Sequence, residues 1–166
     1  MDLLRTNYHW RNRYLLMRHG HSQANAQRKI ISSPERGLTN YRLSEEGEQQ
    51  LLDVLAQWRW PEPTRVVHSD FLRTTHTAAR VAKAFALEMQ QEERLRERHF
   101  GELEGQADSY YPEVWAFDAQ SADHTQWHVE PVSRVAARMC AALDALEQCF
   151  EGETVLVVSH GDPLQI

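Results

Sequence analysis

Short apolar runs of strand length alternate with longer segments of helical periodicity along most of the chain. The predicted strands are Tyr14–Met17, Arg65–Ser69 and Thr154–Val158, with a weaker one at Leu87–Gln90. Strands that alternate with helices are typical of a parallel sheet with helices packed on both faces. We therefore predict an α/β domain with three layers, α/β/α, around a mostly parallel central sheet, in which Tyr14–Met17 is a buried strand.

Three segments carry apolar side chains at helical spacing. The first begins after Ser44, a predicted N-cap followed by two glutamates, and ends before Pro61. The other two cover about 74–86 and about 133–150. The polar stretch 23–43 contains several turn-forming residues and is interpreted as a loop.

Length and composition fit one domain. A chain of 166 residues has ordinary domain size, and its 42% apolar and 25% charged residues are typical of a globular protein. We expect a single domain over 1–166, with a core formed by about 14–98 and 133–166. Residues 99–132 are rich in acidic, aromatic and turn-forming residues, and we interpret them as a lid-like covering segment with short helices.

The net charge of −6 is unevenly distributed along the chain. Residues 1–43 carry a balance of +6, whereas residues 44–166 carry a balance of −12. The overall sign argues against a nucleic-acid partner. The basic excess near the start is nearly all arginine, which is compatible with one region that binds an anion such as phosphate.

Targeting signals are not evident in the sequence. No apolar run is long enough for a membrane-spanning helix, so we expect no membrane partner. Residues 1–13 contain three arginines with no apolar stretch after them, which does not fit a secretory signal. Cys140 and Cys149 are too few and too close in the chain for a disulfide framework. We therefore expect a cytoplasmic protein.

Polar side chains follow every predicted strand at its carboxyl end. In a parallel α/β sheet these ends share one edge, and ligands bind beyond that edge. We therefore expect two histidines, two arginines and one glutamate to converge there. The four segments are Arg18-His19-Gly20, Ser69-Asp70-Phe71-Leu72-Arg73, Leu95-Arg96-Glu97 and Ser159-His160-Gly161.

This set of side chains suits a tetrahedral phosphoryl group. Arg18 and Arg73 can neutralise its non-bridging oxygens. Their positive charge holds off protonation of His19, whose free ring nitrogen can then attack phosphorus. Glu97, if partly desolvated, can donate a proton to the leaving oxygen and later accept one from water. We expect His160 to hydrogen-bond the phosphoryl group, best as a cation.

Five ordered elements between residues 14 and 161 resemble the motifs of the histidine phosphatase superfamily, in its phosphoglycerate mutase-like branch. Arg18-His19-Gly20-His21-Ser22 with Asn25 resembles the family's R-H-G-x-S-x-x-N opening. Five elements in order at strand and helix boundaries make the resemblance highly specific, and it implies the phosphoglycerate mutase-like α/β/α fold. The other four elements are Leu43-Ser44-Glu45-Glu46-Gly47 with Gln50, Ser69 to Thr74 with Thr77-Ala78, Leu95-Arg96-Glu97 with Gly101 and Glu104-Gly105, and Val157-Val158-Ser159-His160-Gly161.

The resemblance implies a role for each matched residue. His19 would be the phosphorylated nucleophile and Glu97 the proton donor, with Arg18 and His160 completing the catalytic set. No metal site and no organic cofactor are implied for hydrolytic members of the family. The implied substrate-binding residues are Arg18, Ser22, Asn25, Arg73, His160 and the Gly161 backbone.

The sequence departs from the family pattern in three places. His21 stands where the family usually has Glu or Gln, a position that supports the nucleophile. Only 62 residues separate Glu97 from His160, which resembles the broad phosphatase branch more than the mutases. The chain stops five residues after Gly161, where Asp162-Pro163 has the pattern of an N-cap and first helical residue. We therefore expect a truncated form, or a member that lacks the last helix and strand.

The predicted function is hydrolysis of a small phosphomonoester through a phosphohistidine on His19, by a monomer or a dimer. Phosphoglycerate mutase-type transfer is the closest alternative, because it uses the same intermediate. A metal-dependent hydrolase would use His19, His21, Asp70 and His160 as ligands. A phosphate-binding protein without turnover is the third alternative.

Overall fold

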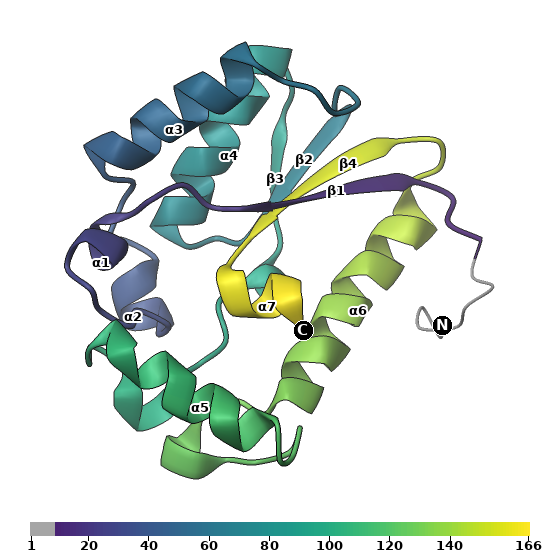
Figure 1. Ribbon diagram of the computed structural model, residues 1–166. Coiled ribbons are helices and arrows are strands. Elements are labelled where there is room, and N and C mark those ends of the chain that lie inside the picture. The colour runs from purple at the N-terminus through teal and green to yellow at the C-terminus, as the bar shows by residue number, and fades with distance from the viewer. Residues whose placement is uncertain (1–8) are drawn as a thin grey trace.

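The computed structural model describes residues 9–166, and its centre is a four-stranded sheet (Figure 1). The strands are β1 (Arg13–Arg18), β2 (Arg65–His68), β3 (Met89–Gln91) and β4 (Thr154–Ser159). They lie in the order β1-β4-β2-β3, and every neighbouring pair is parallel. The predicted α/β fold with a parallel sheet is confirmed.

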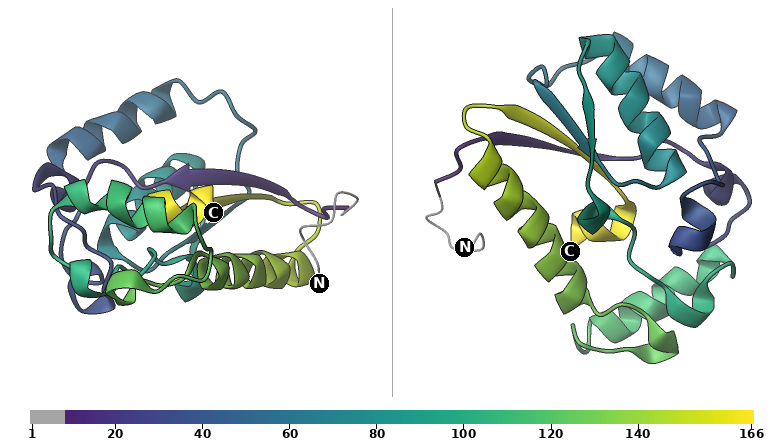
Figure 2. Two further views of the ribbon diagram at one scale, coloured as in Figure 1. Left: turned by 60° about the horizontal axis from the view of Figure 1, so that its bottom comes forward. Right: turned by 180° about the vertical axis from the view of Figure 1, so that it is seen from behind.

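Helices cover both faces of this sheet. The helices α3 (Glu45–Ala56) and α4 (Leu72–Phe85) pack on one face, and α6 (Val132–Cys149) packs on the other (Figure 2). Val66 of β2 contributes to the core under α4, whereas the next residue, Val67, contributes to the core under α6. Successive side chains of a strand point to opposite faces, so a continuous apolar run serves both cores.

Local signals account for the helix boundaries. Ser44 caps α3, since its side chain accepts a hydrogen bond from the Gly47 backbone, and three glutamates stand in the first turn. The helix α4 begins at Leu72, two residues before the predicted start, and ends at Phe85. Its C-cap, Ala86, has a left-handed conformation with φ of 54°. The short helix α7 (Gly161–Gln165) has His160 as its N-cap, not Asp162 as predicted.

Two sequence predictions were wrong in detail. The stretch 23–43, predicted as a loop, contains two short helices, α1 (Gln23–Ala26) and α2 (Pro34–Gly37). The strand β1, predicted to be buried, lies at the edge of the sheet, and its Leu16 is 59% exposed. An edge strand pairs on one side only, so an apolar sequence does not by itself place it inside.

The covering segment, predicted as 99–132, contains several short helices, as expected, and α6 begins at its end, at Val132. Its elements are η2 (Gly101–Leu103), η3 (Asp108–Tyr110), α5 (Tyr111–Asp118) and η4 (Gln126–His128), and η1 (Glu93–Leu95) precedes it. A separate apolar cluster holds the segment together and includes Ile30 from the α1–α2 connection. The segment is therefore packed against the residues that follow α1. Within residues 9–166, no helix has the length and apolar content needed to cross a membrane.

A fully buried arginine joins the covering segment to α7. The Nη1 and Nη2 atoms of Arg98 bond the two carboxylate oxygens of Asp118, at 2.7 and 2.8 Å. Nη1 also lies 3.4 Å from Asp162 of α7, and Nε donates to the Glu130 carbonyl at 2.8 Å. Bidentate pairing of this kind satisfies a buried guanidinium.

Replacing this arginine should destabilise the protein strongly. Arg98→Ala leaves Asp118 and Asp162 close together without their shared cation, at an expected cost of about 3–5 kcal/mol in the free energy of unfolding. Urea unfolding measures this loss. Arg134→Ala, which alters an exposed arginine of α6, should change stability by less than about 0.5 kcal/mol. A loss at Arg98 as small as that of the control would contradict the prediction.

Candidate active site

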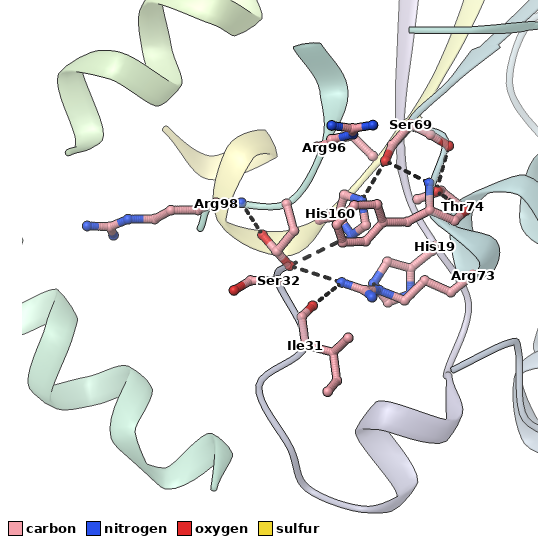
Figure 3. Close-up of polar contacts among 12 residues, drawn as sticks. His19, Ile31, Ser32, Ser69, Arg73, Thr74, Arg96, Arg98 and His160 are labelled. Carbon is pink, nitrogen blue, oxygen red and sulfur yellow. Dashed lines mark hydrogen bonds and ion pairs between the residues drawn. The ribbon is translucent and has the colours of Figure 1, made fainter. Parts of the chain in front are cut away.

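The nucleophile candidate lies directly after β1. The His19 backbone N–H donates to Ser159 O at 3.0 Å and so extends the pairing of β1 with β4. Its Nδ1 lies 2.8 Å from the Gly20 carbonyl oxygen, which can only accept a hydrogen bond. The Nδ1 atom therefore carries the ring proton, and Nε2 is left unprotonated. Consistent with this, Nε2 accepts a hydrogen bond from Nε of Arg73 at 3.1 Å (Figure 3).

Arg73, on the first turn of α4, is the central cation of the site and is only 3% exposed. Its Nη2 donates to the Ile31 carbonyl at 2.9 Å and lies 3.7 Å from Oε2 of Glu97. Its Nη1 is buried and has no hydrogen-bond partner among residues 9–166. Arg73 is therefore held by backbone and carboxylate groups from two distant segments, and its Nη1 can still donate hydrogen bonds to a ligand.

Glu97 and His160 complete the group. Oε2 of Glu97 lies 3.8 Å from Nδ1 of His160, and Oε1 accepts from the Arg98 backbone at 3.0 Å. Nε2 of the fully buried His160 bonds Oγ of Ser69 at 2.9 Å. The rings of His19 and His160 are 5.2 Å apart. We call His19, Arg73, Glu97 and His160 the His19 cluster. The contacts bring these four predicted residues together beyond the carboxyl ends of the strands, where Figure 3 shows His19, Arg73 and His160 side by side.

Burial and neighbouring charge shift the titration of the His19 cluster. Burial and the Arg73 guanidinium hold the pKa of His19 well below its usual value, so its Nε2 is unprotonated at neutral pH. Burial raises the pKa of Glu97 to about 7, although Arg73 acts in the opposite direction. Burial, Arg73 and His19 also hold the pKa of His160 well below its usual value. The structure therefore favours a neutral His160, in contrast to the cation predicted from the sequence.

Arg18 and Gly161 lie side by side at the edge of the site. A Cβ atom placed on Gly161 would lie 3.5 Å from the guanidinium carbon of Arg18. The Arg18 side chain is exposed, and its positive charge contributes to the lowered pKa of His19. Arg18 is thus near the cluster but open to solvent, as expected of a cation at the entrance of an anion site.

Ser22 and Asn25 bond each other at the start of α1. Asn25 Oδ1 accepts from the backbone N–H and the hydroxyl of Ser22, at 3.0 and 2.8 Å, and the Asn25 N–H donates back to Ser22 Oγ at 3.3 Å. This capping box orients the Asn25 side chain. Within residues 9–166 no hydrogen bond joins either side chain to the His19 cluster, so the geometry assigns Ser22 to the support of Asn25.

Sequence reasoning missed three residues near the cluster. Ser69, which bonds His160, was within a quoted motif but received no role. Tyr111 of α5 has its pKa raised by burial and by the nearby carboxylate of Glu97. The charge of Asp162 in turn raises the pKa of Glu97. No local pattern marks Tyr111 or Asp162 as a site residue, because packing of the covering segment and α7 brings them close.

The structure does not assemble the ligand set of the metal-site alternative. His21 Nδ1 lies 2.7 Å from Ser44 Oγ and 3.6 Å from Glu46 Oε2. Both carboxylate oxygens of Asp70 bond Arg96, at 2.8 and 2.6 Å. Over residues 9–166, no three His, Cys, Asp or Glu side chains are grouped so that they could hold a metal ion.

The family of the chain follows from comparison with known proteins. The sequence model of the histidine phosphatase superfamily (branch 1) matches residues 14–166. The chain belongs to this superfamily. The match includes every residue of the His19 cluster, and it confirms the resemblance seen in the sequence.

Relatives of this histidine phosphatase superfamily member carry both phosphatase and mutase names. The probable phosphoglycerate mutase GpmB of Photorhabdus laumondii is 35% identical over 151 residues, which cover 88% of this chain and 68% of that protein. The structure of YhfR from Bacillus stearothermophilus is similar with a TM-score of 0.73 at 28% identity, covering 92% of this chain and 76% of the other. A mycobacterial glucosyl-3-phosphoglycerate phosphatase matches with a TM-score of 0.69 at 26% identity, covering 90% and 74%.

Proposed function

We propose that this superfamily member hydrolyses a small phosphomonoester through a phosphohistidine on His19. One observation carries the proposal. The unprotonated Nε2 of buried His19 is held by Arg73, beside a glutamate whose pKa is about 7. Phosphoryl transfer needs a nucleophile, a group that binds the anion, and an acid. The unprotonated ring nitrogen of His19, the buried cation of Arg73 and the neutral carboxylic acid of Glu97 fit these three roles.

In the first step, His19 Nε2 attacks phosphorus and the bond from phosphorus to the ester oxygen breaks. The leaving oxygen takes the proton of Glu97, so the products are an alcohol, a phosphohistidine and the Glu97 carboxylate. Arg73 and the exposed Arg18 neutralise charge on the non-bridging oxygens. Nη1 of Arg73, which has no hydrogen-bond partner among residues 9–166, is available to bond one of these oxygens.

In the second step, water attacks the phosphohistidine and the phosphorus–nitrogen bond breaks. The Glu97 carboxylate takes a proton from that water, which restores the acid for the next cycle. Free phosphate and the unprotonated His19 Nε2 result. A pKa near neutrality suits both steps, since Glu97 must lose and regain its proton at the same pH.

Mutase activity is the second candidate, because the relative from Photorhabdus laumondii is a probable phosphoglycerate mutase. A mutase transfers the same phosphoryl group back to an alcohol and must exclude water while it does so. Incubation with 3-phosphoglycerate separates the two reactions by ³¹P NMR. Hydrolysis releases inorganic phosphate, whereas a mutase forms the 2-isomer.

The direct test is hydrolysis of p-nitrophenyl phosphate, with and without EDTA. We expect activity that EDTA does not reduce, together with a phosphoprotein that is labile in acid and stable in base. Activity lost with EDTA would favour the metal-dependent alternative instead. Phosphate binding without turnover would favour a protein that only binds, and would contradict the proposed function.

The pH dependence follows from the raised pKa of Glu97. The kcat/KM of an alkyl phosphate should fall as the pH rises through about 7, because Glu97 then loses the proton that the leaving oxygen needs. Ionisation of His19 should not limit the rate there, since its pKa is well below its usual value. The profile is measured from about pH 5 to about pH 9 and corrected for ionisation of the substrate. A profile that stays flat through neutrality would contradict the assignment of Glu97.

A further inference from the structure

A loop on the far side of the phosphate-binding arginine determines where its guanidinium lies. The carbonyl of Ile31 accepts a hydrogen bond from Arg73 Nη2 at 2.9 Å (Figure 3). Ile31 has no side-chain polar group, so the position of this carbonyl depends on the backbone of the loop. Residues 31–33 are each less than 10% exposed, although they belong to no regular element. A buried loop of this kind needs partners for its backbone polar groups.

Glu104 of the covering segment supplies these partners. Its Oε2 accepts from the backbone N–H and the hydroxyl of Ser32, both at 2.7 Å, and from the Ser33 N–H at 3.2 Å. One carboxylate oxygen therefore binds the N–H of the peptide group that carries the Ile31 carbonyl, and the N–H of the next peptide group. Hydrogen bonds to an ionised carboxylate are stronger than those between neutral groups.

The neighbours of Glu104 reinforce the same junction. The Gly105 N–H donates to Ile30 O at 2.7 Å, and the Ile30 N–H donates to Gln106 O at 2.9 Å. The Phe100 N–H donates to Ser32 Oγ at 2.9 Å. Hydrogen bonds therefore join the covering segment to Ile30 and to the loop at residues 31–33. Among these contacts in the described part of the chain, Glu104 is the only charged residue.

The charge of Glu104 also bears on Arg73. A buried arginine requires negative charge nearby. Glu97 lies 3.7 Å away, yet in the proposed mechanism it begins the reaction as a neutral acid. Burial lowers the pKa of Arg73, and the charges of Glu97 and Glu104 oppose this effect. Oε1 of Glu104 is buried without a hydrogen-bond partner among residues 9–166.

We propose that Glu104 is a positioning residue of the active site, which holds Arg73 in its phosphate-binding orientation through the loop at residues 31–33. This inference rests on the proposed function, because it assigns Arg73 to the phosphoryl group. It also gives the covering segment a role in the chemistry beyond shielding the site.

A double-mutant cycle between Glu104 and Arg73 tests the inference. Glu104→Gln keeps the shape of the side chain and removes its charge. Arg73→Lys keeps a cation for phosphate but lacks the nitrogen that reaches Ile31 O. We expect Glu104→Gln to weaken binding of inorganic phosphate, and to lower kcat/KM for p-nitrophenyl phosphate, by about tenfold in the wild-type background. In the Arg73→Lys background the same change should cost less than about twofold.

A merely structural role predicts a different pattern. Glu104→Gln would then lower both quantities by the same factor in both backgrounds, in proportion to any loss of thermal stability, and the inference would be overturned. Unchanged phosphate affinity in the single variant would overturn it as well. The matched control is Glu102→Gln, in the same segment, where an exposed carboxylate pairs with exposed His128. Its phosphate affinity should stay within about twofold of wild type.

One further variant and one further measurement test the inference if the first experiment fails. If Glu104→Gln does not fold, Ser32→Ala removes one of the three bonds to Oε2, together with the bond from the Phe100 N–H to Ser32 Oγ. It should weaken phosphate binding about threefold, again only when Arg73 is present. An equal effect in both backgrounds would overturn the inference. If the wild-type protein binds phosphate but does not hydrolyse esters, the proposed function fails. The cycle is then measured on phosphate affinity alone, so the two failures are distinguishable.

Discussion

His19→Ala should lower kcat for p-nitrophenyl phosphate by about 10⁵-fold, because removal of a catalytic nucleophile typically has an effect of that order. The buried ring nitrogen that Arg73 holds is then absent, and no phosphoenzyme can form. The fold should persist, since the sheet and both of its cores lie outside the site. Steady-state kinetics and phosphoprotein trapping, together with circular dichroism, measure these outcomes.

The neighbouring histidine provides a matched control for this variant. His21 bonds Ser44, and no hydrogen bond within residues 9–166 joins its side chain to the His19 cluster, so His21→Ala should keep activity within about threefold. A metal site built on His19 and His21 would lose activity with either substitution. Substantial turnover by His19→Ala would show that another group is the nucleophile.

Glu97→Gln should separate substrates by their leaving groups. The kcat/KM of an alkyl phosphate is expected to fall by about 10³-fold, within the range of general acid catalysis, because an alkoxide needs a proton to leave. p-Nitrophenolate is a stable anion and barely needs one, so its phosphate ester should lose less than about tenfold. The comparison is made on the same preparation at a pH below neutrality, where Glu97 of the wild type is protonated.

An exposed glutamate of the same charged run serves as the control for this second variant. The side chain of Glu93 in η1 is 75% exposed, and Glu93→Gln should leave both rates within about twofold. Equal losses on the two substrates with Glu97→Gln would indicate that the carboxyl positions Arg73 and does not supply the proton.

The main elements of the fold were predictable because they depend on local patterns. Apolar runs at β2 and β4 and the capping serine of α3 have physical consequences within a few residues, through side-chain alternation and helix capping. The exposure of Leu16 was not predictable in this way. Whether β1 is central or at the edge depends on which strands pair with it, and the apolar run itself carries no such information.

The short helices α1 and α2 were missed for a related reason. Each has four residues, too few for hydrophobic periodicity to appear. The capping box of Ser22 and Asn25 was the available signal for α1. These residues were interpreted only through the family resemblance, which assigned them to substrate binding, and their capping bonds to each other were not predicted.

The sequence by itself determined that His19, Arg73, Glu97 and His160 share one edge of a parallel sheet. Strands that alternate with helices are parallel, so the residues after their carboxyl ends lie at one edge of the sheet. This argument needs no knowledge of side-chain contacts. Only the tertiary structure decided their protonation and support. The neutral His160, the pKa of Glu97 near 7 and the Glu104 contacts to the Ile31 loop arise from burial and from residues distant in the chain. Desolvation and electrostatic interaction depend on distances in space, which no local sequence pattern contains.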